Sequence, residues 1–206
     1  MNSPKSTTWF GLPLLGALFL CACATASSAD LAPSPRVESS RPIRAALRAT
    51  ELQPLAIGNS WSYRGTMAGQ PVSRTVTIER IEDGFFVDDA SGRLKLDSEG
   101  LRDDKRYLLK EPIARGHKWM AVLSVTSTER YEIVETDLEV DTPKGRFEGC
   151  VQVRAHNRID ANRALESDWF FAPGVGIVRI ETRLREGDRQ IPQAHIELTD
   201  YRLAQP

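Results

Sequence analysis

The chain has 206 residues, of which 41% are hydrophobic and 27% charged, and its 27 basic and 28 acidic side chains give a formal net charge of −1. This length and apolar content are enough for one domain with a sizeable core and a short tether. A balanced, slightly acidic chain has no excess of positive charge for nucleic acid, so we expect no nucleic-acid partner.

Residues 1–22 have the layout of a secretory signal peptide. Lys5 is their only charged residue, and an apolar run from Trp9 to Leu20 follows it. This run is shorter than the roughly 20 apolar residues that a transmembrane helix needs, and it matches the apolar core of a cleaved signal. We therefore predict that residues 1–22 are removed and take no part in the fold.

The apolar run ends in Leu20-Cys21-Ala22-Cys23, which resembles the lipobox of bacterial lipoproteins. The resemblance implies that Cys23 carries a thioether-linked diacylglycerol, becomes the mature N-terminus and anchors the protein in a membrane. It also implies the outer membrane, facing the periplasm, because Asp rather than Ala24 would hold such a lipoprotein at the inner membrane. The alternative is an ordinary signal cleavage at Ala22 or Ala24 without a lipid.

Cys150 is the other cysteine that remains after this processing. A lipidated Cys23 cannot form a disulfide, so in an oxidising compartment Cys150 is expected to be free or paired with another molecule. We expect a neighbouring element to cover it partly, with a reactive thiol site as the alternative.

A tether and a short helix are predicted before the folded domain. Residues 24–40 are rich in Ala, Ser and Pro, which indicates a flexible or extended segment. Residues 41–53 could form a short helix, with Ser40 as its cap, Pro42 in its first turn and Pro54 as its end. The predicted organisation is therefore a signal peptide at 1–22, a lipidated tether with a short helix at 23–54, and a β domain at 55–206.

The clearest hairpin begins at residues 134–141, where apolar or Thr side chains alternate strictly with acidic ones. This period of two is typical of a half-buried antiparallel strand, and it predicts that one face carries Val134, Thr136, Leu138 and Val140. Thr142-Pro143-Lys144-Gly145 forms the turn. On the returning strand we expect Phe147, Val151 and Val153 to face inward.

The same alternation recurs at residues 75–79, 178–185 and 194–199, and turn signals such as Asp83-Gly84 separate the runs. Regularly spaced strands with one solvated face predict a mainly β protein. We expect a strongly curved antiparallel sheet or half-barrel of about nine or ten strands.

Four motifs support a family resemblance over about residues 55–203. They are Trp61-x-Tyr63, Gly116-x-x-Trp119, Thr142-Pro143-x-Gly145-x-Phe147-x-x-Cys150 and Trp169-Phe170-Phe171-Ala172-Pro173-Gly174-Val175-Gly176. Together they resemble a loose set of bacterial secreted and lipid-anchored domains without an assigned activity. A more distant resemblance is to the half-barrel of periplasmic lipoprotein carriers and receptors. Both resemblances imply architecture, because the motifs consist of turn glycines and core aromatics.

The sequence contains no recognisable catalytic or metal-binding motif. His117, His156 and His195 have no second ligand at a metal-type spacing, and we expect them at the surface. "APGVG" lacks the Lys of a phosphate loop, and no Gly-x-Ser-x-Gly elbow is present. We therefore expect a protein that is not an enzyme, with no catalytic residues, metal or cofactor.

Aromatic side chains are the best candidates for a binding site. A curved sheet carries many large rings here, and two interpretations stay open: ordinary core packing, or an apolar cavity on the concave face for a lipid, an acyl chain or a protein segment. The candidates are Trp61, Tyr63, Trp119, Trp169 and Phe171. We expect a non-enzymatic binding module of the envelope. The alternative is a structural or assembly lipoprotein that meets a protein partner at a sheet edge or at the Arg-rich segment 41–48.

Overall fold

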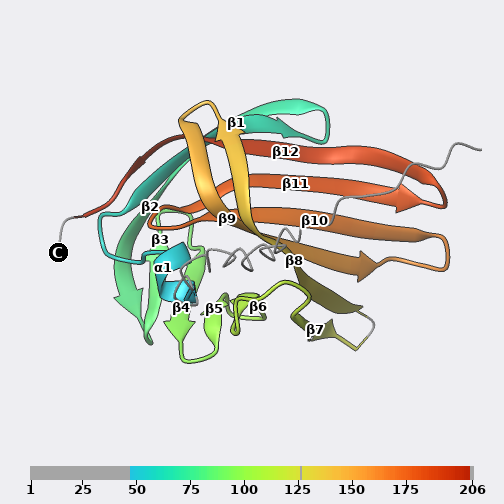
Figure 1. Cartoon of the computed structure of the whole chain (residues 1–206), viewed down its shortest axis with the longest axis horizontal. Helices are drawn as coiled ribbons and strands as arrows, with labels where there is room; N and C mark the ends of the chain where they lie inside the picture. Colours follow the sequence, from blue (N-terminus) through green and yellow to red (C-terminus); the bar gives the residue numbers. More distant parts are fainter. Residues whose placement is uncertain (1–46, 126, 205–206) are drawn as a thin grey trace, which may run out of the picture. The chain divides into compact units, whose positions relative to one another are not determined.

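The computed structural model describes residues 47–125 and 127–204, which form twelve strands and one short helix (Figure 1). The predicted signal peptide, Cys23, the tether, Ser40 and Pro42 lie outside these residues. The elements are α1 (Ala49–Leu52), β1 (Ser60–Met67), β2 (Gln70–Glu82), β3 (Phe85–Asp88), β4 (Arg93–Asp97), β5 (Gly100–Arg102), β6 (Tyr107–Lys110), β7 (Lys118–Ser124), β8 (Ser127–Thr142), β9 (Gly145–Arg158), β10 (Arg163–Ala172), β11 (Gly176–Glu186) and β12 (Arg189–Arg202). None of the helices in the described part of the chain is long and apolar enough to cross a membrane.

All twelve strands belong to one antiparallel sheet, in the order β6-β5-β4-β3-β2-β1-β12-β11-β10-β9-β8-β7. Each strand pairs with its neighbour in sequence, except that β1 pairs with β12 while β6 and β7 form the two edges. The sheet is thus an up-and-down meander arranged in a ring that stays open between β6 and β7. This confirms the prediction of a mainly β, strongly curved antiparallel sheet. The strand count exceeds the prediction because β3 to β6 span only three to five residues each.

The sheet curls around α1 at one end, while β10, β11 and β12 run on beyond the curled part (Figure 1). Ala49 and Leu52 of α1 are buried in a first core cluster together with residues from β5, β6 and β8 to β10, among them Leu109, Ile133 and Val153. A second cluster includes Trp61, Val178 and Leu198. The core therefore fills the curled end of the sheet.

The helix is shorter than predicted, as far as the described residues show it. Arg48 has an extended backbone (φ −116°, ψ 153°), so α1 begins at Ala49 and ends before Gln53. The Glu51 carboxylate accepts a hydrogen bond from the Arg48 backbone N–H at 2.8 Å, which fixes this start. Because Arg48 is the N-cap, residues 47 and 48, which were predicted to be helical, lie before the helix.

Strand β8 departs from the predicted alternation because it is irregular in the middle. Its register against β9 shifts at three points between Ile133 and Val140, and Asp137 has a left-handed backbone (φ +68°). A bulge inserts an extra residue and changes which face the following side chains occupy. Leu138 and Val140 join the second core cluster as predicted, but Ile133 rather than Val134 is fully buried opposite Val153, so the prediction was wrong for Val134.

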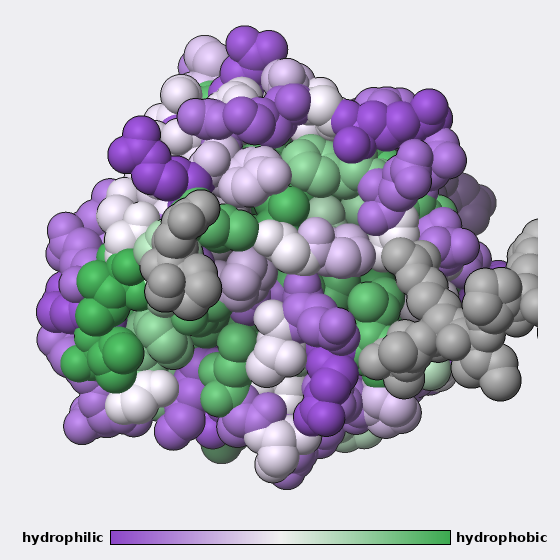
Figure 2. Space-filling model, turned by 60° about the vertical axis from the view of Figure 1, so that its left-hand side comes forward, coloured by the Kyte–Doolittle hydropathy of each residue, from purple (hydrophilic) through white to green (hydrophobic). Residues whose placement is uncertain are grey.

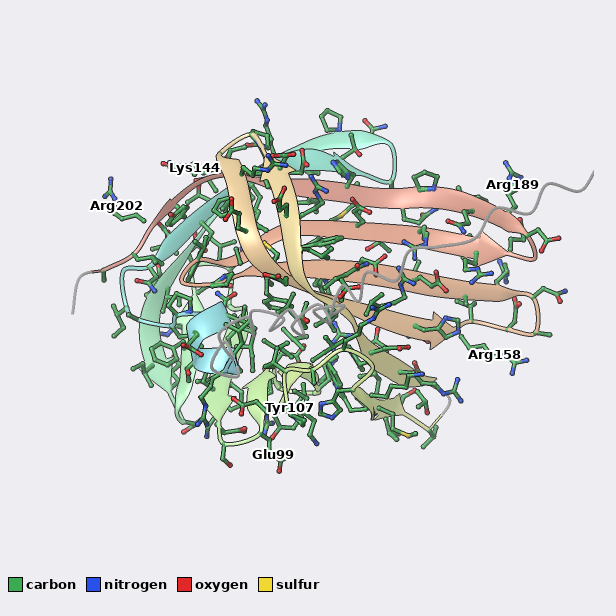
Figure 3. The ribbon with its side chains drawn as sticks, viewed as in Figure 1. Glu99, Tyr107, Lys144, Arg158, Arg189 and Arg202 are labelled. Carbon is green, nitrogen blue, oxygen red and sulfur yellow. The ribbon has the colours of Figure 1, made fainter. Side chains whose placement is uncertain are left out.

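The tip of the β8–β9 hairpin is fixed to β12. The backbone N–H of Lys144 donates to the Leu198 carbonyl at 3.2 Å, and the Lys144 ammonium pairs with the Asp200 carboxylate. Figure 3 places Lys144 at this tip, and Arg158 and Arg189 at the opposite, extended end of the sheet. The hairpin turn is thus anchored across the sheet.

Candidate functional site

Three aromatic rings form a stack on the face of the sheet that we call the inner face. Trp119 of β7 lies parallel to Tyr131 of β8, with ring centroids 5.2 Å apart and an interplanar angle of 6°. Trp169 of β10 follows at 6.0 Å from Tyr131. Phe171 is completely buried in the same core cluster. The structure therefore brings together three of the five candidate aromatics, and they pack as a filled core.

A buried ion pair connects this stack to the loop before β6. The guanidinium of Arg106 pairs with the Glu129 carboxylate, and the Tyr131 hydroxyl donates to the same carboxylate. Burial, reinforced by this hydrogen bond, raises the pKa of Tyr131. Arg106 also lies 5.7 Å from the centre of the Trp169 ring. Arg106, Glu129 and Tyr131 were not identified as site residues from the sequence. The alternation Glu129-x-Tyr131-x-Ile133, whose three residues are buried, is the signal that could have indicated two of them.

The other two candidates, Trp61 and Tyr63 of β1, line a separate cavity of about 170 Å³. They alternate along one strand and so share a face, as the sequence spacing indicated. The strands β2, β3, β4 and β11 and the residue Gln53 contribute the rest of the wall, with Ile78, Phe86, Leu94, Ile177 and Ile180 among the lining residues. The predicted aromatics thus fall into two groups: Trp61 and Tyr63 line this cavity, whereas Trp119, Trp169 and Phe171 belong to the first core cluster, and Trp119 also borders a separate hollow.

The main polar groups in the cavity wall have partners within the protein, including the Asp88 carboxylate, which accepts the backbone N–H groups of Ala90 and Gly92 at 2.8 Å. The Trp61 indole N–H donates to the Val175 carbonyl at 2.7 Å, and the Tyr63 hydroxyl donates to the Ile177 carbonyl at 2.9 Å. The Gln53 side-chain oxygen accepts the backbone N–H of Ile177 at 3.1 Å. Burial raises the pKa of Tyr63, so its hydroxyl keeps its proton at physiological pH. Such a wall offers an occupant mainly apolar surface.

Apolar side chains continue from the cavity along the extended end of the inner face. Direct cross-strand partners share a face, so Trp169, Ile180 and Ile196 lie in one row of the inner face. Other rows of cross-strand partners follow toward the extended end of the sheet. The apolar residues in these rows belong to neither core cluster. We name this surface the apolar shelf; it consists of Met67, Leu165, Ile180, Leu184, Ile191 and Ile196. Ile180 belongs to both the shelf and the cavity wall, so the two are continuous.

The outer face of the sheet carries a ladder of ion pairs across β9, β10 and β11. The Asp168 carboxylate is bound by Arg154 at 2.8 Å and Arg183 at 2.7 Å, and only 2% of Asp168 is exposed. Burial pushes the pKa of Asp168 upward, but the hydrogen bonds from the two arginines outweigh burial and leave the pKa lowered. Glu166 beside it is held in the same way by Arg183 and Arg185. We interpret this ladder as a set of interactions that stabilises the sheet.

A hollow of about 510 Å³ lies next to the ladder, over β7 to β10. Six of its nine lining residues are charged or histidine, and several of these are engaged with each other, as in the Lys118–Glu132 pair at 3.4 Å and the His156–Glu166 contact at 3.4 Å. The hollow is larger than the cavity, but its groups offer no unpaired set for one ligand type. We therefore place the candidate binding site at the cavity and the shelf.

The remaining residues singled out from the sequence do not form a site. His117 bonds the Pro112 carbonyl at 2.7 Å, and His195 lies 3.4 Å from Glu197. Cys150 is a free, fully buried thiol whose pKa burial raises to about 11. A thiol in this environment stays protonated and inert, so the expectation of a covered cysteine is confirmed over that of a reactive one.

Exposed hydrophobic residues gather in several separate patches among hydrophilic ones on the face shown in Figure 2. Patches of this kind are common on soluble domains. Such patches do not by themselves identify a site. The candidate site is therefore defined by the cavity and the shelf that continues from it.

Comparison with known proteins gave two distant structural neighbours. One is described as a "putative lipoprotein" from Parabacteroides distasonis ATCC 8503, with a TM-score of 0.42 and 12% identity; the match covers 76% of this chain and all of that one. The other is described as a "putative exported protein with YmcC-like fold" from Bacteroides fragilis NCTC 9343, with a TM-score of 0.40 and 13% identity over 74% of this chain and 99% of that one. No protein-family model and no curated protein matches the chain. At these values nothing about function follows from the neighbours.

Proposed function

We propose that this protein is a lipid-anchored protein of the bacterial cell envelope that binds an apolar chain, such as the acyl chain of a lipid, on the inner face of its sheet. The cavity beside Trp61 and Tyr63, continuous with the apolar shelf, is the observation that carries the proposal. It acts as a binding module and catalyses no reaction.

The dimensions of the site favour a chain over a compact ligand. At about 170 Å³ the cavity is smaller than the roughly 300–1,000 Å³ typical of pockets that enclose a whole small molecule. It has room for one end of an acyl chain, and the shelf provides surface along which the rest can lie. Because the Trp61, Tyr63 and Asp88 polar groups of the wall are bonded within the protein, a ligand gains affinity chiefly by burying apolar area.

The anchor places this site at a membrane. We propose that Cys23 carries the lipid and that the domain faces the periplasm from the outer membrane, on the strength of Leu20-Cys21-Ala22-Cys23 and of Ala24. A binding module held at a membrane surface has lipids as its nearest source of apolar chains. The residues concerned lie outside the described part of the structure.

Binding of a fluorescent fatty acid, 11-(dansylamino)undecanoic acid, tests the proposal. Wild-type protein should enhance its fluorescence saturably, and Ile180→Trp, which fills the junction between cavity and shelf, should weaken binding by about tenfold or more, or about 1.4 kcal/mol. Ala164→Trp puts the same ring on the outer face of β10 and should bind like wild type. Equal binding by all three proteins, or none by wild type, would contradict the proposal.

A structural or assembly role through a protein partner is the second candidate. The exposed apolar side chains Met120 and Val122 on the edge strand β7 favour it, because such an edge is suited to protein contacts. Lipid extraction of the purified protein separates the two candidates. A bound lipid lost in Ile180→Trp supports the binding module, whereas a protein without lipid in both forms supports the assembly role.

A further inference from the structure

The edge strand β7 has an unusual outer surface. Within the described residues it pairs with β8 on one side and with no strand on the other. The opposite edge, β6, is linked to β7 through the Trp119 indole, which donates to the Tyr107 carbonyl at 2.9 Å, rather than by backbone pairing. Met120 and Val122 on the outer face of β7 are 66% and 71% exposed.

Natural proteins normally protect edge strands by shortness, charge, proline or a covering element. The edge strand β6 follows this rule, because it has only four residues and ends in Lys110. Strand β7 has seven residues, and its single charged residue, Lys118, lies at its first position. The middle of β7 therefore presents an apolar, β-prone edge.

Alternate residues of β7 point their backbone hydrogen-bonding groups toward the free side. Gly116 and His117 exchange backbone hydrogen bonds with Ile133, so the residues bonded toward β8 are the odd-numbered ones that follow, Trp119 and Ala121. By alternation, the N–H and C=O groups of Met120 and Val122 face away from β8. A strand added here would find both donors and acceptors.

We propose that two copies of this chain associate through β7, pairing antiparallel around a two-fold axis at Ala121. In this register Met120 of each copy lies opposite Val122 of the other, and Lys118 lies opposite Ser124. The four exposed apolar side chains then form one continuous patch, as a self-complementary two-fold interface requires. The hydrogen-bonded pairs fall on Met120 and Val122, whose backbone groups face the free side.

Charges on the neighbouring strand agree with this register. Lys118 keeps its partner Glu132 on β8, and Arg130 lies beside Met120 on the same face. In the paired arrangement no charged residue lies directly opposite a like charge of the other copy. Like charges directly opposite would have destabilised the pairing.

Disulfide trapping in the full chain, expressed in a bacterial envelope, tests the proposal. Ala121 lies on the two-fold axis as a non-hydrogen-bonded pair, where the two Cα atoms are about 4.5 Å apart, a separation that a disulfide can span. Ala121→Cys should therefore give a species of twice the chain mass on a non-reducing gel. Thr128→Cys, one strand further in, should not, because its copies lie about three strand spacings or 14 Å apart. Buried Cys150 contributes no background, and any cross-link through Cys23 would appear equally in Thr128→Cys.

A second substitution shows whether the apolar patch drives the pairing. Val122→Lys is at an exposed site and leaves the fold intact, and in the Ala121→Cys background it should abolish the cross-linked species. Ile81→Lys, at a similarly exposed site on β2, should leave the cross-link unchanged. The proposal is overturned if Ala121→Cys gives no dimer, if Thr128→Cys cross-links equally well, or if Val122→Lys has no effect. A cross-link only to a chain of another mass would assign the edge to a different protein.

Discussion

Burial decides the chemistry of single residues in this protein, and Cys150 is the clearest case. Its sulfur lies 3.6 Å from the Phe147 carbonyl within the second core cluster, where no water reaches it. Desolvation penalises the thiolate and so raises the pKa of the thiol from 9.0 to about 11. The folded state therefore binds the Cys150 proton more tightly than the unfolded chain does.

Alkaline unfolding tests this assignment. Below pH 9 the contribution of Cys150 to the free energy of unfolding is complete, and between about pH 9 and 11 it should fall by about 1.4 kcal/mol per pH unit. Urea unfolding of wild type and Cys150→Ala across this range isolates the effect, since both proteins contain the same tyrosines. Parallel curves for the two proteins would contradict it.

Only some of the residues in the candidate site could be predicted from the sequence. The spacing of Trp61 and Tyr63 is enough to place both rings on one face of a strand. Their meeting with Ile177 and Ile180 depends on which strand pairs with β1, and alternation within a strand carries no information about that. The Arg106–Glu129 pair was missed for the same reason, because its partners lie in separate elements and charged residues are normally expected outside.

Elements are held in register by cross-strand pairs, of which the Asp168 ladder is the most buried. Asp168 joins Arg154 of β9 to Arg183 of β11, so one carboxylate connects three strands. Breaking a buried pair leaves an uncompensated charge and costs more than an exposed pair contributes.

Asp168→Asn should lower the free energy of unfolding by about 3–5 kcal/mol, because it leaves two arginines without their carboxylate. Glu181→Gln, at the neighbouring and more exposed outer position on β11, should lower it by about 1 kcal/mol or less. Urea unfolding at neutral pH compares the two. A loss of the same size in both variants would show that the ladder adds no special stability.

The ladder also predicts acid sensitivity. The pKa of Asp168 lies below its ordinary value of 3.8 and that of Glu166 below 4.5, so both contribute stability above these values and lose it as the pH falls further. Wild type should lose stability progressively below about pH 4.5, and Asp168→Asn should show a shallower decline. An equally steep decline in the variant would contradict this.

Strands and turns were the most predictable elements. The turn at residues 142–145 joins β8 to β9 as expected, since Pro and Gly specify local backbone angles. The β8 bulge could not be predicted, because nothing in Thr136-Asp137-Leu138 requires a left-handed residue at Asp137. The short strands β3 to β6 have too few residues to show a period of two, and so the strand count was too low.

At the scale of the whole molecule, side chains rather than backbone ladders close the ring between β6 and β7. The Trp119 indole bonded to the Tyr107 carbonyl and the Arg106–Glu129 pair cross this opening. Figure 3 shows Tyr107 on β6 beside this gap. Loss of the Trp119–Tyr107 hydrogen bond or of the Arg106–Glu129 pair should loosen the short strands near β6 before it affects the central strands.

Trp119→Phe keeps the ring stack but removes the indole N–H, and should cost about 1 kcal/mol. Amide hydrogen exchange of β5 and β6 should then accelerate about fivefold, whereas exchange in β11 and β12 should change little. Uniform acceleration across the sheet would mean that Trp119 supports the global fold and not the opening alone.

The proposed membrane attachment is a property of the whole molecule. Cys23→Ser removes the proposed lipid acceptor and should move the protein from the membrane fraction to the soluble periplasmic fraction. Cys21→Ser should leave it in the membrane fraction. Fractionation of cells expressing each variant, followed by immunoblotting, distinguishes the two; retention of Cys23→Ser in the membrane fraction would sink the lipid anchor.

The pairing of β1 with β12 also governs when the protein can fold. Ser60 lies opposite Arg202, so the ladder in the middle of the sheet joins the first strand of the domain to its last. A chain crossing a membrane from its N-terminus delivers β1 long before β12, and until then β1 has a partner only on its β2 side. The central contacts span almost the whole domain, which slows folding and leaves strand edges open meanwhile. Under the proposed export, productive folding waits for the last strand, and the partly translocated chain is the form that most needs protection.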